Sequence, residues 1–280
     1  MIDISIFRVI HPAKYLRDHF ASNTRPDGRE FTSFRPASVN IGSITQADSS
    51  SVFKIGNTAV ICGIKAELAC PKAEEPEYGF IIPNVELTPL SSPKFRPGPP
   101  GEEAQCLTKL VERILMNSEA LDLKDLCIHK DKLVWALYCD LVCVDYDGSV
   151  IDACVGALMA ALKKLSLPKV EYTPETGATK VDPKQKISIP LRQLAVSSTF
   201  AVFEEQLLIF DPTEDEEQLS LSTVTIVFNE NDMCLVHKSG GIPISQEIFS
   251  KCLTKAKNRA DQVRKLISSA ASTVKTNGWE

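Results

Sequence analysis

Short apolar runs rich in β-branched residues mark the first half of the chain. They favour strands over residues 37–44, 50–57 and 58–68. Gly56-Asn57, between the last two runs, is typical of a tight hairpin turn. Residues 131–146 are apolar at nearly every position, which predicts a central strand covered on both faces. The intervening stretch 71–101 is polar and rich in proline.

Apolar residues recur at helical spacing in four other segments. The predicted helices cover residues 11–23, a segment that starts at Glu102, the segment after Asp147-Gly148, and residues 244–272. The last helix carries lysines and arginines beside its apolar face. We expect that basic face to be solvated surface.

The later part of the chain is rich in predicted strands, over residues 194–213, 222–229 and 233–241, with a hairpin turn from Asn229 to Asp232. This order of elements favours an α+β fold with mixed sheets backed by helices, rather than a doubly wound parallel sheet. We expect a single two-lobed domain over residues 1–280. Its parts are a first lobe over 1–170, a polar connector over 171–186 that forms a surface loop, and a second lobe over 187–280.

Composition narrows the class of protein. The chain has 280 residues, of which 44% are hydrophobic and 24% are charged, so it can bury a full core. No apolar run reaches the roughly 18 residues needed to span a bilayer. Arg8 and Pro12 interrupt the first apolar run, which is wrong for a signal peptide. We therefore expect a soluble protein that is not exported and has no membrane partner.

Cysteine and histidine usage argues against a metal centre. The nine cysteines include no CxxC pair, and the four histidines are scattered. The apolar segments contain four of the cysteines, as is common for buried free thiols: Cys62, Cys139, Cys143 and Cys154. We expect reduced thiols in a reducing compartment, no zinc site and no cofactor. The net charge of −5 argues against nucleic-acid binding through bulk positive charge, so an RNA contact would need a local patch.

Five motifs carry a resemblance to a known family. They are RPDGRE at 25–30, IGNTAVICGIKAE at 55–67, RPGPPGEEA at 96–104, DYDGSVIDACVGALMAAL at 145–162 and LLIFDPTEDEE at 207–217. Together and in this order they resemble the RNase PH family, over nearly the whole chain. The third and fifth motifs are similar to those of a ring subunit of the eukaryotic RNA exosome.

The resemblance implies a two-lobed fold of the ribosomal protein S5 domain 2-like type. Active members of the family are phosphorolytic 3′→5′ exoribonucleases. In them a phosphate ion, held by backbone amides and an arginine, attacks the last phosphodiester. Phosphoryl transfer depends mainly on positioning and charge neutralisation, so a working site must place a cation against two anions.

The family's phosphate-binding turn has a counterpart here without its arginine. Active members have Gly-Gly-Thr-Arg-Thr before a helix, and the matching residues here are 147–151. Val150 stands at the arginine position, after Ser149. Three carboxylates lie nearby in the sequence and are expected to repel phosphate: Asp145, Asp147 and Asp152. We interpret Ser149 and Val150 as a degenerate phosphate site.

A second departure concerns the acidic pair of active members, two aspartates six residues apart. The matching positions here are Glu217 and Thr223, and a threonine cannot supply the charge of a carboxylate. The acidic run 214–217 could suggest a metal cluster, but we interpret it as an acidic, solvated loop before a strand. The sequence therefore predicts a degenerate acidic site, no bound metal and no enzyme activity.

Three basic residues are candidates for RNA contact. Lys94 and Arg96 lie on the proline-rich stretch, and Arg113 lies on the helix that follows. In the family the matching region lies near the central channel of a six-membered ring, where basic side chains touch the RNA backbone. The alternative is that these side chains are solvated surface charges.

The resemblance implies a non-catalytic structural subunit of the RNA exosome core ring, supporting 3′→5′ RNA processing and degradation. The implied partners are other RNase PH-like ring subunits, S1/KH-type cap subunits, separate exosome-associated nucleases and RNA. The implied locations are the nucleus, nucleolus and cytoplasm. Two alternatives stay open: an active phosphorolytic exoribonuclease with a displaced phosphate ligand, and a free-standing RNA-binding adaptor.

Overall fold

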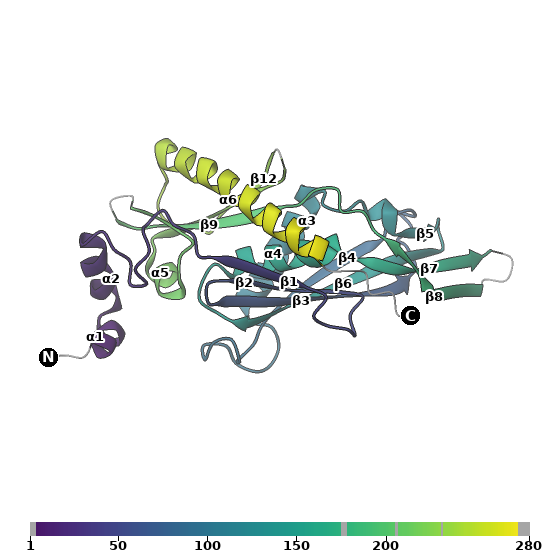
Figure 1. The fold of residues 1–280 in the computed structure, drawn as a ribbon, viewed down its shortest axis with the longest axis horizontal. Coiled ribbons are helices and arrows are strands. Elements are labelled where there is room, and N and C mark those ends of the chain that lie inside the picture. Colours follow the sequence, from purple (N-terminus) through teal and green to yellow (C-terminus); the bar gives the residue numbers. More distant parts are fainter. Residues whose placement is uncertain (1–3, 175–177, 205–206, 231, 274–280) are drawn as a thin grey trace.

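A computed structural model describes residues 4–174, 178–204, 207–230 and 232–273 (Figure 1). Its α-helices are α1 (Ile4–Ile10), α2 (Pro12–Ala21), α3 (Glu102–Ser118), α4 (Val150–Lys163), α5 (Glu214–Leu219) and α6 (Gln246–Thr273), and a 3₁₀ turn covers Leu123–Leu126. Its strands are β1 (Ala37–Ile41), β2 (Ser49–Ile55), β3 (Thr58–Ala69), β4 (Phe80–Leu87), β5 (Cys127–His129), β6 (Leu133–Asp145), β7 (Ser166–Thr173), β8 (Ala178–Ser188), β9 (Val196–Val202), β10 (Leu208–Phe210), β11 (Ser222–Phe228) and β12 (Met233–Lys238). The ends of the two predicted lobes, residues 1–3 and 274–280, lie outside the described residues.

The larger sheet has the strand order β1-β2-β3-β6-β4, with β5 beside β6. Its neighbours are antiparallel except β4 and β6, which run parallel. The hairpin predicted between β2 and β3 is confirmed, and its Gly56 has a positive φ of 55°. Strand β6 is central, as predicted. Tyr138 and Asp140 on it are exposed, however, so the prediction that both faces are covered is wrong for its second half.

Helix α4 lies between the two main sheets. It packs against β2 and β3 of the larger sheet and against β9 of the smaller one, whose order is β10-β9-β11-β12. Every residue from Val150 to Leu162 is buried. Helix α6 packs against β1, β9 and β11, and α3 packs against β4 and β12. The predicted α+β fold with mixed sheets backed by helices is therefore confirmed.

A two-stranded hairpin replaces the surface loop expected over residues 171–186. Strands β7 and β8 pair antiparallel and form the opposite end of the molecule from α1 and α2 (Figure 1). The register places Lys169 opposite Asp182 and Glu171 opposite Lys180, so opposite charges are cross-strand neighbours. These two pairs of opposite charge are compatible with strands in a largely polar sequence. Residues 175–177 of the predicted connector lie outside the described part.

Two further elements were not apparent from the sequence. Helix α1 precedes the predicted α2, and β4 lies within the proline-rich stretch. Because β4 is an edge strand, it can contain Pro83, which has no N–H to donate.

The burial of the core cysteines is confirmed. Cys62, Cys139, Cys143 and Cys154 are each 0% exposed and free of disulfides. Burial raises the pKa of the Cys139 thiol to about 12, which keeps it protonated and unreactive. Among the described residues, no helix is long and apolar enough to cross a membrane.

Candidate functional site

A cleft of about 430 Å³ lies where α3, α5, the start of α4 and the smaller sheet meet. Val150, Glu217 and Thr223 all line it, although they come from three different segments. Ser149 contributes its backbone amide at the same place. The structure thus brings together the positions that the family pattern assigned to phosphate and to the acidic pair.

The turn before α4 is fixed by close packing against the segment that leads into α5. Gly148 has a φ of 72°, and a Cβ added there would lie 2.5 Å from the carbonyl oxygen of Pro212. The Ser149 hydroxyl donates to that same carbonyl at 3.1 Å, and Ser149 itself has a left-handed φ of 51°. The two segments therefore hold each other in place at the floor of the cleft.

The backbone amide of Ser149 in this turn already has a carboxyl partner. The backbone N–H of Ser149 donates to Oε1 of Glu217 at 2.8 Å. Burial raises the pKa of the Glu217 carboxyl to about 7, although the hydrogen bond from Ser149 favours the charged form. A carboxylate of the chain itself occupies the place where the family's turn would offer its amide to phosphate.

The carboxylates near this amide are not the three expected from the sequence. Asp152 points away toward β9, where its two oxygens accept from the N–H and hydroxyl of Thr199 at 2.8 and 3.1 Å. Asp147 lies 3.4 Å from Arg35, and Asp145 is exposed at the end of β6. The prediction that these three surround the turn is therefore wrong. The cleft is lined instead by three other acids: Glu103, Glu214 and Glu217.

The acidic run 214–217 is a helix, so its interpretation as a solvated loop is wrong. Helix α5 begins with a capping box formed by Thr213 and Glu216. Glu216 is 1% exposed and accepts from Nε of Arg25 at 2.9 Å. Caps and a buried partner, neither visible in a local charge pattern, stabilise this run as a helix. Within the described residues, no group of three or more potential ligands is placed to hold a metal.

Lys94 is the one lysine or arginine among the described residues that line the cleft. Its Nζ lies 3.4 Å from Glu103, 3.5 Å from Glu214 and 3.8 Å from the ring centroid of Tyr146. The Tyr146 hydroxyl donates to Glu103 at 2.7 Å. The positive charge of Lys94 is therefore already matched by side chains of the chain itself.

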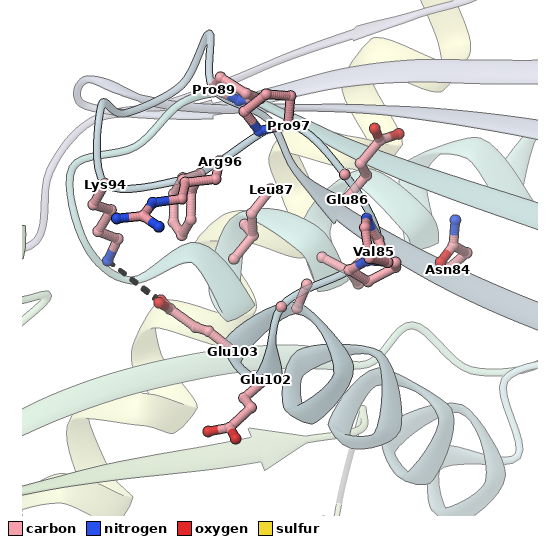
Figure 2. Close-up of a pocket in the computed structure, with 16 residues that line it drawn as sticks. Asn84, Val85, Glu86, Leu87, Pro89, Lys94, Arg96, Pro97, Glu102 and Glu103 are labelled. Atoms are coloured by element: carbon pink, nitrogen blue, oxygen red, sulfur yellow. Dashed lines mark hydrogen bonds and ion pairs between the residues drawn. The ribbon is translucent and has the colours of Figure 1, made fainter.

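The other two candidate RNA-binding residues lie outside this cleft. Arg96 lines a separate cavity of about 730 Å³ between β4, the proline-rich loop (residues 88–101) and the start of α3 (Figure 2). Arg113 is exposed on the outer side of α3. Within the described part of the chain, the side chain of neither arginine has a hydrogen bond or an ion pair. Both remain available to an external anion.

A buried ionic network next to the cleft was not predicted. Nε and Nη2 of Arg35 donate to the two oxygens of Asp211 at 2.9 and 2.7 Å, and Nη1 donates to the carbonyl of Asp147 at 2.6 Å. Burial raises the pKa of Asp211, but the hydrogen bonds and charge of Arg35 outweigh it and leave that pKa below its ordinary value. The network joins Arg35, which follows the first motif, to Asp211 in the fifth motif. No local spacing in the sequence indicates this pairing.

Comparison with known proteins decides the family. The signature described as "3′ exoribonuclease family, domain 1" matches residues 33–168, and that of domain 2 matches residues 193–259. The chain belongs to the RNase PH family of 3′ exoribonucleases.

Relatives within the RNase PH family match almost the whole chain. The exosome complex component rrp43 of Schizosaccharomyces pombe is 36% identical over 91% of this chain and 94% of its own. The exosome complex component Rrp42 of Methanothermobacter thermautotrophicus is 34% identical over 89% of this chain and 92% of its own. A solved structure described as an Archaeoglobus fulgidus exosome with RNA bound to the active site covers 92% of this chain and 98% of its own, with a TM-score of 0.82 and 32% identity.

Membership of the RNase PH family indicates which residues of the cleft to compare with those of active members. Ser149 directly precedes α4, and Val150, its first residue, lines the cleft. Val150 is 5% exposed and apolar, so it offers no charge to phosphate. Thr223 contributes a neutral hydroxyl, which is hydrogen-bonded to the Ser239 hydroxyl at 2.8 Å.

Proposed function

We propose that this chain is a non-catalytic structural subunit of an RNA exosome core ring. In that role it forms part of the ring and of the RNA channel, and supports 3′→5′ RNA processing and degradation carried out by other subunits. The relatives named as exosome components, which match over about nine tenths of the chain, support the ring assignment. The likeness to an archaeal exosome structure supports the same assignment.

One observation carries the non-catalytic part of the proposal. The amide of Ser149, which would face phosphate, donates instead to Glu217. A phosphate entering the cleft would meet Glu103, Glu214 and Glu217, while the single lysine there is already paired with two of them. Like charges at close range oppose binding by more than a helix terminus favours it. The paired lysine and the occupied amide support the proposal, because phosphoryl transfer needs a cation that is available to neutralise the charge of phosphate.

RNA contact in this proposal comes from side chains beside the cleft. Arg96 and Arg113 are exposed and free of internal partners within the described residues, so they can meet phosphate oxygens of a passing strand. The further partners proposed are other RNase PH-type ring subunits, S1/KH-type cap subunits and separate nucleases. We also propose a location in the nucleus, nucleolus and cytoplasm.

Native mass spectrometry of the complex purified through this chain tests the ring assignment. The expected result is one 30.8 kDa copy of this chain together with five related RNase PH-type subunits. Recovery of a stable, soluble monomer would contradict the ring assignment and favour a free-standing RNA-binding adaptor.

A further inference from the structure

Contacts hold the proline-rich loop (residues 88–101) at its start, in its middle and at its end, while residues 96–99 make no hydrogen bond with the rest of the described structure. At its start, the N–H of Tyr146 donates to the Ser91 carbonyl at 3.2 Å, next to the end of β6. At its end, Gln105 donates to the Pro100 carbonyl at 2.9 Å. In the middle, Lys94 lines the cleft and its neighbour Phe95 packs against Tyr146.

Lys94 joins the loop to three separate elements. Its ammonium group contacts Glu103 on α3, Glu214 on α5 and the face of Tyr146, which follows β6 (Figure 2 shows the contact with Glu103). Only 32% of the Lys94 side chain is exposed. Burial, with Glu217 and Glu103 nearby, raises the pKa of the Tyr146 phenol, so that phenol remains a hydrogen-bond donor to Glu103. Lys94 therefore has the surroundings of an anchor.

Phe95 also holds the loop, by packing against Tyr146. Its ring meets Tyr146 edge-on, with the centroids 5.2 Å apart, and its N–H donates to the Ser92 carbonyl at 3.2 Å. Beyond it, residues 96–99 are exposed and, in the described structure, make no hydrogen bond with the rest of the chain. Gly98 has a φ of 139° and open space around its Cα. The loop is thus held up to Phe95 and projects from Arg96 onward.

We propose that Lys94 is a positioning residue that anchors the proline-rich loop and presents Arg96 to RNA phosphates, and that Lys94 does not itself bind RNA. To reach a phosphate, the Lys94 ammonium would leave Glu103 and Glu214 without their shared cation. Among the described residues, the side chain of Arg96, two residues further on, has no partner to give up. The inference rests on the proposed function, because it assigns the RNA-contacting cation of that role.

The test uses the assembled complex carrying Lys94→Met, Lys94→Arg, Arg96→Ala, or both Lys94→Met and Arg96→Ala. Native mass of each variant complex is measured first, so that a failure of the ring assignment is recognised separately. Hydrogen exchange of residues 90–96 then reports the anchor without RNA. We expect exchange there to be roughly three- to tenfold faster with Lys94→Met, from loss of the ion pairs and the cation–π contact. Lys94→Arg restores protection, because a guanidinium can make both kinds of contact.

Affinity for single-stranded RNA, measured across a salt series, shows whether Lys94 only positions Arg96 or itself contacts RNA. We expect Arg96→Ala to reduce the slope of log affinity against log salt by about 0.7, the value for one phosphate contact. Adding Lys94→Met to Arg96→Ala then causes no further loss of affinity, because Lys94 acts through Arg96.

Two results would contradict the proposal that Lys94 anchors the loop without binding RNA. One is unchanged exchange in the Lys94→Met complex. The other is a double variant in which the losses of RNA affinity from the two substitutions add and the slope of log affinity against log salt falls a second time. That result would show that Lys94 itself binds RNA. If Arg96→Ala leaves both affinity and slope unchanged, the presentation of Arg96 to RNA is wrong, even where the exchange result shows Lys94 holding the loop.

Discussion

At Glu217 a single side chain changes what the cleft can hold. Its carboxylate accepts the Ser149 N–H at 2.8 Å, across 68 residues of sequence. The family register placed Glu217 and Thr223 beside the turn, and the structure brings both to one cleft. The hydrogen bond itself could not be predicted, because no local spacing indicates which distant amide a carboxylate will reach.

The raised pKa of Glu217 predicts a specific pH dependence of stability. Its folded pKa of about 7 lies above the ordinary value of 4.5, so the folded state is favoured while the group is protonated. That contribution is complete below about pH 4.5 and is lost as the pH rises through about 7. Glu217→Gln keeps an acceptor for Ser149 and removes the charge, so relative to wild type it gains about 2–3 kcal/mol between these limits.

Urea unfolding of both chains at about pH 5 and about pH 7.5 measures this difference. Glu67→Gln, on an exposed position of β3, is the matched control and should behave as wild type at both values. An equal change in the free energy of unfolding of Glu217→Gln and of wild type between the two pH values would refute the buried charge.

Replacing Val150 by arginine should not create phosphorolysis. Val150 lines the cleft beside Glu217, so a guanidinium there would pair with that carboxylate before it met phosphate. Thr223 would still lack a charge. Nucleoside diphosphate release from RNA and inorganic phosphate measures the outcome, and rates above background from Val150→Arg alone would show that the arginine was the one missing part.

At the scale of elements, the turn before α4 depends on its contact with α5. A methyl group at Gly148 would meet the carbonyl of Pro212 and the backbone of Thr213 at 2.5 Å, in a left-handed conformation. Gly148→Ala should therefore lower the free energy of unfolding by about 2 kcal/mol or more. Gly63→Ala, which adds a methyl group into open space on β3, is the control for the change in residue type and should cost less than half as much. Equal losses in both variants would mean that the contact with α5 is unimportant.

The elements that could be predicted are those whose pattern is set by burial. Helices α3, α4 and α6 were foreseen, because each has an apolar face that packs on a sheet. Strand β4 was missed, because Pro83 and a flanking proline-rich loop hide a strand whose outer edge needs no donor at that residue. The β7–β8 hairpin was missed because its sequence is largely polar, and its apolar cross-strand pairs, Leu167 with Ile187 and Val170 with Val181, are few.

At the scale of the whole molecule, packing on both sides fixes the position of α4 and of the turn before it. The helix is buried between two sheets from its first residue to Leu162. The Arg35–Asp211 network fixes the turn that leads into it. Substitutions that disrupt this framework, at Val150 among others, would destabilise the core, whereas Thr223 is only partly buried. The fold is thus constrained by packing even where the chemistry is not.

Phosphate-dependent release of nucleoside diphosphates by the purified complex tests the central claim most directly. The matched complex carries Glu217→Ala and Thr223→Ala in this chain, which removes the two side chains at the family's acidic positions. If the chain is a structural subunit, both complexes release nucleoside diphosphates at the same rate, whatever the other subunits contribute. A lower rate in the substituted complex, with its native mass unchanged, would show that this cleft performs phosphorolysis.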